Sequence, residues 1–555
     1  MSEPHLSAEV RIPDSLRALV QDKLEQAARD RVADRLNAGD PELWAAPGTP
    51  EVADRLGWLT IAERMLSAID EVERFADGVR GDGFGDVVLL GMGGSSLAPE
   101  VLRRSFGAGP GHPRLHVLDS TDAEAILAVG RSVDLEHTLF IVSSKSGGTI
   151  EPLSLFAHFW DAVGRVREGP QGACFAAVTD PGSGLAELAA SHGFRHTFLG
   201  DPNIGGRYSA LSPFGIVPAA LMGVDVRALL EGAADAARTR IEIDGAPAAE
   251  PAGVWLGAAL SALATEGRNK LTFLIGDSFP GLGLWLEQLV AESTGKQGTG
   301  ILPVAEEPVG VPADYGADRV FVHIGNPADG DAATLDEAVD ALAAAGHPVV
   351  RMPAAGPTDL GRLFLLWELA VAVAGWGLAI NPFDQPNVQQ AKDATNAVLA
   401  GYEASGELPA VEPATTEQLR TLLDVSPPGY VAIMAYARPD DPTFDAAIAE
   451  LRAAIRARGG ATTTFGYGPR FLHSTGQFHK GGPKTGRFLQ FVHDVAEDVS
   501  IPGRDFTFTT LKNAQATGDL QTLRELGLPA ERVVLSEQDP VGAIRALTAE
   551  IKESR

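Results

Sequence analysis

The sequence predicts an α/β protein with two doubly wound αβα domains on parallel sheets, a helical N-terminal segment and a smaller C-terminal α/β appendage. Short apolar runs alternate with helix-like segments from about residue 86 onward. These runs are continuously apolar, as in strands that are buried on both faces of a parallel sheet. The length of 555 residues is enough for two to four compact domains.

The first segment, residues 1–75, is rich in Leu, Ala, Glu, Asp and Arg at helical spacing, as in QDKLEQAARDRVADRL. Breaks are expected at Pro41 and at the PGTP near residue 50. We therefore expect a helical lead-in here. Nothing at the N-terminus has the apolar core of a secretory signal.

The next segment, residues 76–235, is expected to form the first αβα domain. Its predicted strands are DVVLL, which runs into a glycine turn, LHVLDS (115–120), TLFIVSS (138–144) and ACFAAVTD (173–180). Helix-like stretches such as Ile150 to Val166 separate them. Strand, loop and helix in repetition are typical of a doubly wound sheet.

The same pattern returns in residues 236–407, the expected second domain. Its predicted strands are LTFLIG (271–276), DRVFVHIG (318–325) and HPVVRMP (347–353). Residues 408–555 follow a proline-bounded linker and are expected to form the appendage, with strands in GYVAIMAY and ATTTFGYG. The apolar run from Leu363 to Ile380 could span a membrane by length, but its central Glu368 favours a buried core helix.

Composition narrows the function classes. The chain carries 45 Lys and Arg against 73 Asp and Glu, a net charge of −28. Such a surface repels phosphate backbones, so we expect no nucleic-acid partner, and the core-helix interpretation implies no membrane. The single cysteine, Cys174, excludes an internal disulfide and fits a reducing, cytoplasmic setting.

Two loops could hold an anion, since each follows a predicted strand and opens a helix. The first, Gly91 to Ser96, approximates GxGxxG, and Asp119 ends the next strand as a ribose-binding acid would. It therefore leaves NAD binding, or a plain tight turn, as alternatives. The second, Ser143 to Thr149, combines hydroxyls and one ammonium in the composition of a monophosphate site. An N-cap with spare serines is the alternative, although two such loops on one sheet favour an anion site.

One carboxylate is placed for proton transfer. Gln288 and Glu292 lie four residues apart in LGLWLEQLVAESTGK and so share a helix face. Glu292 falls in the last turn before Gly295, where the negative helix end should raise its pKa. A base with a raised pKa suits proton abstraction near neutral pH. A solvated glutamate on a surface helix is the alternative.

Together with GMGGSSLAPE, SSKSGGTIEP, GGRYS and NPFDQPNVQQAK, these residues resemble the glucose-6-phosphate isomerase family, which is built from two sugar-isomerase (SIS) domains. The resemblance covers about residues 35–400. It implies phosphate contacts from Ser95, Ser144, Lys145, Ser146, Thr149 and Gln385. It implies a catalytic set of Glu292 as base, Gln288, Arg207 as the group that steadies the enediolate, and Lys392 as a ring-opening helper. Ser146 replaces a threonine of the family.

The resemblance also implies a reaction and an assembly. The expected reaction interconverts glucose 6-phosphate and fructose 6-phosphate through a cis-enediolate, with a small sugar phosphate as partner and without cofactor or metal. The expected assembly is a homodimer. GDPELWAAP, RLGWLTI and RFLHSTGQFHKGGP resemble the isomerase half of bifunctional transaldolase/glucose-6-phosphate isomerase chains, although no transaldolase half is visible.

The family's ring-opening histidine, lent by the partner subunit, has no match at its usual place. The histidines there are His323 and His347, whose surroundings differ from the family's. We therefore hypothesise that His473 or His479 replaces it. With no third ligand at a suitable spacing, these two residues are poor metal ligands.

Rival functions remain open at this level. A noncatalytic SIS regulator would bind sugar phosphates without needing Glu292. An amidotransferase relative would need an N-terminal cysteine, but position 2 is serine. A NAD-dependent dehydrogenase would explain the first glycine loop and little else. Activity on other hexose phosphates and the role of the appendage are left open.

Overall fold

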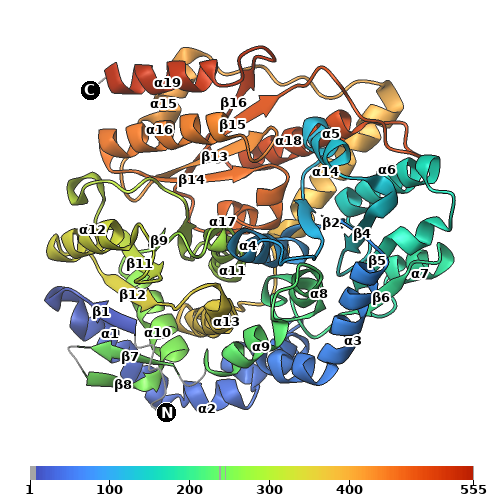
Figure 1. Ribbon diagram of the computed structural model, residues 1–555. Coiled ribbons are helices and arrows are strands. Elements are labelled where there is room, and N and C mark those ends of the chain that lie inside the picture. The colour runs from blue at the N-terminus through green and yellow to red at the C-terminus, as the bar shows by residue number, and fades with distance from the viewer. Residues whose placement is uncertain (1–7, 237–238, 244–245, 554–555) are drawn as a thin grey trace.

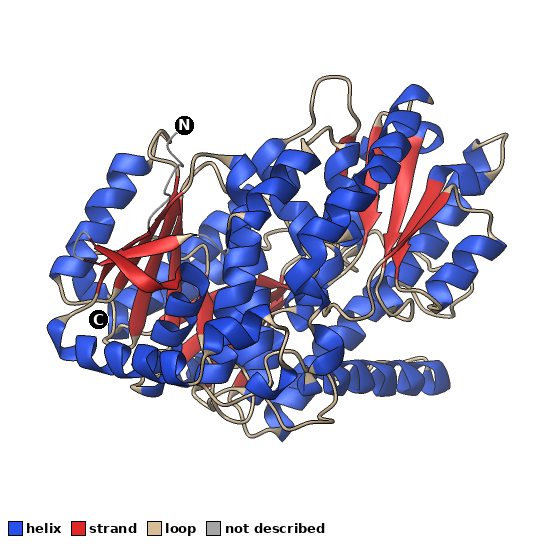
Figure 2. Ribbon diagram, turned by 90° about the horizontal axis from the view of Figure 1, so that it is seen from below, coloured by secondary structure: helices blue, strands red, loops and turns tan. Residues whose placement is uncertain are grey.

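The computed structural model describes residues 8–236, 239–243 and 246–553, and within them three sheets form the frame of the molecule (Figure 1). Figure 2 shows the strands in separate groups with helices between and around them. The α/β class with parallel sheet cores is confirmed.

The first sheet has the order β3-β2-β4-β5-β6, and all its neighbouring strands are parallel. Its strands are β2 (Asp86–Leu90), β3 (Arg114–Leu118), β4 (Thr138–Ser143), β5 (Phe175–Thr179) and β6 (His196–Leu199). Its helices are α4 (Leu97–Phe106), α5 (Ala123–Ser132), α6 (Ile150–Val166), α7 (Gly184–Ser191), α8 (Pro213–Leu221) and α9 (Val226–Ala234). β2, β4 and β5 are buried along their whole length, as their apolar runs predict.

The second sheet has the order β10-β9-β11-β12-β1-β7-β8 and is mixed. Its strands are β1 (Ala8–Arg11), β7 (Arg240–Ile243), β8 (Ala246–Pro251), β9 (Lys270–Ile275), β10 (Leu302–Val304), β11 (Arg319–Gly325) and β12 (Val349–Pro353). The stretch from β10 to β12 is parallel, as expected, whereas β1 runs antiparallel to β12 and β7 pairs antiparallel with β8.

Within the described residues 8–75, the N-terminal segment is mostly helical apart from β1, which the sequence analysis placed in the helical lead-in. Its helices are α1 (Asp14–Arg29), α2 (Val32–Asn37) and α3 (Ile61–Gly81). β1 has only the alternating pattern AEVR, half buried and half exposed. Four residues are too few for that pattern to stand out beside a long helical segment.

The helices of the second unit are α10 (Ala252–Thr265), α11 (Leu282–Thr294), α12 (Ala332–Ala344) and α13 (Leu360–Gly377). In the described part of the chain, one helix, Pro357–Gly377, has the length and composition to cross a membrane, and 89% of its apolar window is buried inside the protein. α13 packs against α10, α9 and α11. The apolar run is therefore a core helix, as the sequence predicts.

The C-terminal part is a third doubly wound unit, with the parallel order β14-β13-β15-β16. Its strands are β13 (Tyr430–Tyr436), β14 (Thr462–Tyr467), β15 (Gly486–His493) and β16 (Ala530–Leu535). The helices from α14 onward are α14 (Pro386–Ser405), α15 (Thr416–Leu423), α16 (Pro442–Gly459), α17 (Gly476–Gly481), α18 (Phe508–Glu525) and α19 (Gly542–Glu553).

The three units meet around α4, α11 and α17, which lie together near the centre of Figure 1. α14 crosses from the second unit to the third and packs along α18. The loops that the sequence analysis selected converge on this junction. The third unit therefore contributes residues to this junction.

Candidate active site

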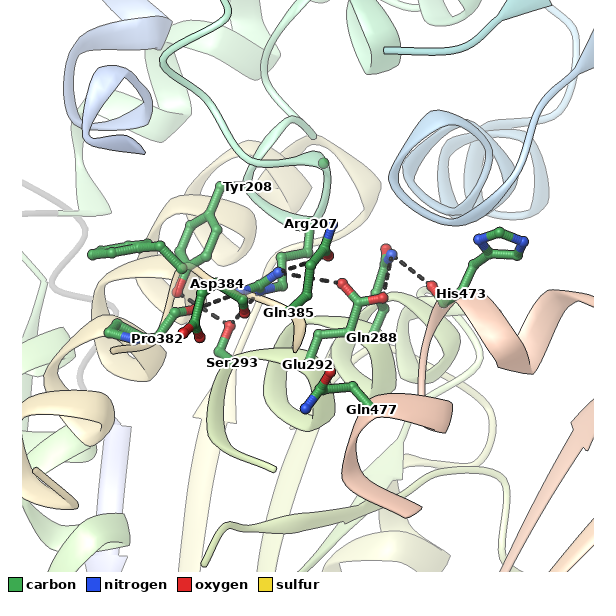
Figure 3. Close-up of polar contacts among 12 residues, drawn as sticks. Arg207, Tyr208, Gln288, Glu292, Ser293, Pro382, Asp384, Gln385, His473 and Gln477 are labelled. Carbon is green, nitrogen blue, oxygen red and sulfur yellow. Dashed lines mark hydrogen bonds and ion pairs between the residues drawn. The ribbon is translucent and has the colours of Figure 1, made fainter. Parts of the chain in front are cut away.

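Glu292 lies near the C-terminal end of α11, and its side chain is buried at the junction (Figure 3). The residue is 3% exposed, which excludes the solvated-glutamate alternative. Burial raises the pKa of Glu292 above its ordinary value, against the opposing charge of Arg207 and a hydrogen bond from Gln288. The expected direction is correct, but the leading cause is burial. Gly295 caps the helix at φ −80°, outside the left-handed region that a terminal glycine often adopts.

Arg207 is 1% exposed, and its guanidinium spreads over the base end of the site. Its Nη1 lies 3.4 Å from Glu292 Oε2 and donates to Gln385 Oε1 at 3.2 Å. Its Nε donates to Ser293 Oγ at 2.8 Å, and its Nη2 donates to backbone carbonyls, including that of Asp384 at 3.0 Å. These contacts use the N–H donors of the guanidinium, and they fix its positive charge beside the Glu292 carboxylate.

Gln288 links the base to the third unit. Its Nε2 donates to His473 O at 2.8 Å and lies 3.5 Å from Glu292 Oε1. Its Oε1 is buried and has no hydrogen-bond partner among the described residues. The approach is possible because Gly93 and Gly94 carry no side chain: a Cβ on Gly93 would lie 2.8 Å from Gln288 Nε2, and one on Gly94 would lie 2.0 Å from a backbone oxygen.

The serine-rich loop opens α6, as expected. Gly147 N donates to Ser144 Oγ at 3.2 Å, Gly148 N donates to Ser146 Oγ at 3.4 Å, and Ser144 Oγ lies 3.4 Å from Thr149 Oγ1. The hydroxyls thus gather at the N-terminal end of a long helix, where an anion is favoured.

Two other proposed phosphate contacts are engaged elsewhere in this structure. The ammonium of Lys145 pairs with Asp180 and donates to Asp201 O at 3.0 Å. Gln385, at the start of α14, accepts from Arg207 and so lies at the base end of the site. Ser95 lies in the first glycine loop, 8% exposed.

His473 reaches the same junction from the third unit. Its Nε2 lies 3.0 Å from Oε1 of Glu151, in the first turn of α6. Burial alone would raise the pKa of Glu151, but the charge and hydrogen bond of His473 outweigh it and hold that pKa below its ordinary value. A cavity of about 70 Å³ beside the pair is also lined by Thr149 and by Lys392 of α14. The structure therefore brings His473, Lys392 and the serine-rich loop together.

His479 is not brought to this site. It is 5% exposed, its Nδ1 lies 3.0 Å from Tyr430 OH, and its ring stacks on that tyrosine. Burial and the charge of Lys480 lower the pKa of His479 to about 3. The structure thus separates the two histidines that the sequence left as equal candidates. Within the described residues, no group of three or more His, Cys, Asp or Glu could hold a metal ion.

Asp119, whose position after a strand suggested NAD binding, is buried and hydrogen-bonded within the protein. Both its carboxylate oxygens accept hydrogen bonds from Arg470, at 2.7 and 2.8 Å, and Ser96 Oγ lies 3.3 Å from one of them. The carboxylate is 2% exposed. It therefore joins two units of the fold.

Sequence reasoning missed several residues here. Glu151 lies in SSKSGGTIEP and Lys296 lies in LGLWLEQLVAESTGK, but the sequence analysis assigned roles only to neighbouring residues of these motifs. Lys296 Nζ donates to Asp384 Oδ1 at 2.6 Å and to Asn381 O at 2.9 Å, and burial lowers its pKa to about 7. Gln515, which donates to Glu151 Oε1 at 2.7 Å, comes from α18 in the third unit and carries no motif that could have revealed it.

Comparisons with known proteins show the family to which the chain belongs. A family model described as phosphoglucose isomerase matches residues 50–299. A glucose-6-phosphate isomerase of Rubrobacter xylanophilus is 32% identical over 416 residues, which cover 66% of this chain and 94% of that protein. The chain belongs to the phosphoglucose isomerase family. A glucose-6-phosphate isomerase of Carboxydothermus hydrogenoformans is 31% identical and covers 63% of this chain and 86% of its own length.

Solved structures share the phosphoglucose isomerase fold. A hypothetical protein from Thermus thermophilus matches with a TM-score of 0.59 at 26% identity, over 71% of this chain and 100% of its own. A glucose-6-phosphate isomerase from Chlamydia trachomatis matches with a TM-score of 0.54 at 18% identity, over 70% and 86%. The likeness to bifunctional transaldolase chains stays a prediction.

Proposed function

We propose that this protein is an aldose–ketose isomerase that interconverts glucose 6-phosphate and fructose 6-phosphate. One observation carries the proposal. A buried carboxylate, Glu292, lies beside the Arg207 guanidinium and is joined through Gln288 to the segment that carries His473. The proposed base (Glu292), the cation (Arg207) and the proposed acid (His473) thus lie at the junction of the three units. Membership of the phosphoglucose isomerase family supports the same reaction.

The phosphate would be held by the serine-rich loop. Ser144, Ser146 and Thr149 supply hydroxyls at the start of α6, where the positive end of the helix favours an anion. Lys145 would add charge if its ammonium left Asp180. Phosphate binding supplies binding energy that is remote from the reacting carbons.

Ring opening would fall to His473. It would protonate the ring oxygen as the bond from that oxygen to the anomeric carbon breaks, and the proton that the anomeric hydroxyl releases would return through water to His473. Glu151 holds the imidazole at 3.0 Å, and Lys392 lines the same cavity. The product of this step is the open-chain sugar.

Proton transfer would then use Glu292. Its carboxylate takes the proton from C2 and returns it at C1 through a cis-enediolate, while the hydroxyl proton passes from O2 to O1. Arg207 offsets the negative charge on the enediolate oxygen. A pKa raised by burial suits a base that must both accept and return a proton. The unpartnered Gln288 Oε1 supplies an acceptor for a substrate hydroxyl. The proton and electrons stay on the substrate, so the reaction needs no redox cofactor.

Substrate entry requires the junction to widen. The cavity beside His473 is about 70 Å³, well below the roughly 300–1,000 Å³ of small-molecule pockets. Glu292 is almost inaccessible. We therefore propose that side chains lining this cavity move when the sugar phosphate binds, while the contact between Glu151 and His473 is kept.

Two further expectations stay with the proposal. A cytoplasmic location fits a chain with a single cysteine and a phosphorylated substrate. The homodimer rests on the resemblance alone. The residues proposed for catalysis all come from one chain.

A coupled assay tests the reaction. Purified protein is given fructose 6-phosphate, and the glucose 6-phosphate that appears is followed through a dehydrogenase. The proposal predicts turnover that follows the enzyme concentration. No turnover, with sugar phosphates still raising the melting temperature, would contradict it and favour the noncatalytic regulator.

A further inference from the structure

A chain of polar side chains crosses between the first and third units beside the cavity. Thr121 Oγ1 donates to Gln515 Oε1 at 2.8 Å, and Gln515 Nε2 donates to Glu151 Oε1 at 2.7 Å. His473 Nε2 lies 3.0 Å from that same carboxylate oxygen. Thr121 and Glu151 belong to the first unit, while Gln515 and His473 belong to the third. The two hydrogen bonds of Gln515 and the contact of His473 with Glu151 thus all cross the boundary between the first and third units.

We propose that Gln515 is a positioning residue for the Glu151–His473 pair, which it fixes across the boundary between the two units. This inference rests on the proposed function, in which His473 opens the sugar ring. Gln515 is 2% exposed, and it lines the same cavity as Lys392 and His473. Its side chain is therefore well placed to act on the pair without taking part in the bond changes.

The direction of the Gln515 amide is set by its neighbours. An ionised carboxylate only accepts hydrogen bonds, so the NH₂ group of Gln515 must face Glu151. The hydroxyl of Thr121 then donates to the amide oxygen on the other side. With the amide turned over, its oxygen would face the Glu151 carboxylate and that hydrogen bond would be lost, whereas the Thr121 hydroxyl could accept from the NH₂ group. Glu151 thus sets the orientation of the amide, and Thr121 adds a second hydrogen bond to it.

The consequence for Glu151 follows from hydrogen bonding to its charged form. A donor to a carboxylate favours ionisation, so Gln515 helps to keep Glu151 negative at full burial. The other titratable groups that face Glu151 are His473, Lys392 from α14 and Tyr436 from β13. All three are retained when only Gln515 is replaced. A change in the titration of the pair can then be assigned to the lost amide.

Two buried ion pairs flank the polar chain. Lys512 Nζ, one turn before Gln515 on α18, lies 2.9 Å from Asp122 Oδ2, and both side chains are fully buried. Arg470, three residues before His473, makes two hydrogen bonds with Asp119. These contacts fix α18 and the His473 segment on the first unit. Gln515 therefore reaches Glu151 from a rigid element.

The test replaces Gln515 with leucine, which keeps the size of the side chain and removes both hydrogen bonds. Gln490→Leu is the matched control: Gln490 is equally buried on β15, donates to Ala516 O at 2.9 Å and accepts from Arg532. Two properties are measured. One is the pKa of His473, from its imidazole resonance in histidine-labelled protein, assigned with His473→Asn. The other is the exchange between the anomers of glucose 6-phosphate, which requires ring opening alone.

In Gln515→Leu, ionised Glu151 loses a donor and becomes more basic, so the pKa values of the pair should rise. The acidic limb of anomer exchange should move to higher pH, and its rate should fall about tenfold. Gln490→Leu should match the unmodified protein in both. A Gln515→Leu protein that titrates and exchanges anomers like the control would overturn the proposal.

Thr121→Val is the second variant, for the case that Gln515→Leu does not fold. It removes the hydroxyl that donates to the Gln515 amide oxygen, so the amide is held less firmly against Glu151 and the His473 resonance should shift in the same direction by less. An unshifted resonance would overturn the proposal. The resonance is read without turnover, so a failed isomerase assay and a failed positioning role give different results.

Discussion

Replacing Arg470 with leucine should release the His473 segment from the first unit. Arg470 begins the short helix Arg470–His473, and its guanidinium makes two hydrogen bonds, 2.7 and 2.8 Å long, with Asp119. Arg470 is 8% exposed and Asp119 is 2% exposed. Without the arginine, the described residues leave Asp119 one hydrogen bond, from Ser96 Oγ at 3.3 Å.

The cost follows from leaving that charge buried. Breaking a buried ion pair by removing one partner typically costs about 3–5 kcal/mol. That corresponds to a rise of about 10²–10⁴-fold in the population of the opened segment. Native-state hydrogen exchange of the amides in residues 470–481 measures this population directly. The same opening should lower anomer exchange, because His473 leaves Glu151.

Asp440→Asn provides the comparison. Arg104 and Asp440 also join the first and third units, at 2.7 Å, but the Asp440 side chain is 60% exposed. An exposed pair contributes about 0–1 kcal/mol, so hydrogen exchange should change less than tenfold. Adding Asp119→Asn to Arg470→Leu should restore much of the lost protection, since no buried charge is left. Equal protection in Arg470→Leu and Asp440→Asn would refute the reasoning.

Three further results are expected. His473→Asn should abolish anomer exchange and isomerisation of ring-closed substrate, whereas His479→Asn should keep both; activity in the first variant would remove His473 from the mechanism. Burial raises the pKa of Glu368 well above its ordinary 4.5, so the folded chain keeps a proton that the unfolded chain releases, and stability falls as pH rises above that value. Glu368→Gln should therefore raise the melting temperature more at pH 8 than at pH 5, and an equal gain at both would contradict this. Specific activity should not change on dilution through any dimer–monomer transition seen by sedimentation, because one chain carries the proposed site; a proportional loss would show that a partner is needed.

The apolar strands and the glycine- and serine-rich loops that follow them could be predicted because each leaves a local pattern. DVVLL and TLFIVS are continuously apolar and become β2 and β4. β1 could not be predicted, because its four residues gain their stability from pairing with β12, more than 300 residues away. The cause of the Glu292 pKa shift was missed for the same reason. Its burial depends on loops from other units and on no feature of its own helix.

Candidate site residues that share one sequence motif could be selected from that motif. Residues that meet only where two units of the fold pack together could not. His473 and His479 are indistinguishable in HSTGQFHKGG, yet one reaches Glu151 and the other packs on Tyr430. The difference arises from the docking of the third unit through Arg470 and Lys512. Such long-range ion pairs leave no periodicity in the sequence.

The central claim is that Glu292 moves the proton while His473 opens the ring. NMR of glucose 6-phosphate with Glu292→Gln measures both steps in one sample. The account predicts that isomerisation falls by about 10²–10⁴-fold while exchange between the anomers continues. Near-normal formation of fructose 6-phosphate by Glu292→Gln would contradict it.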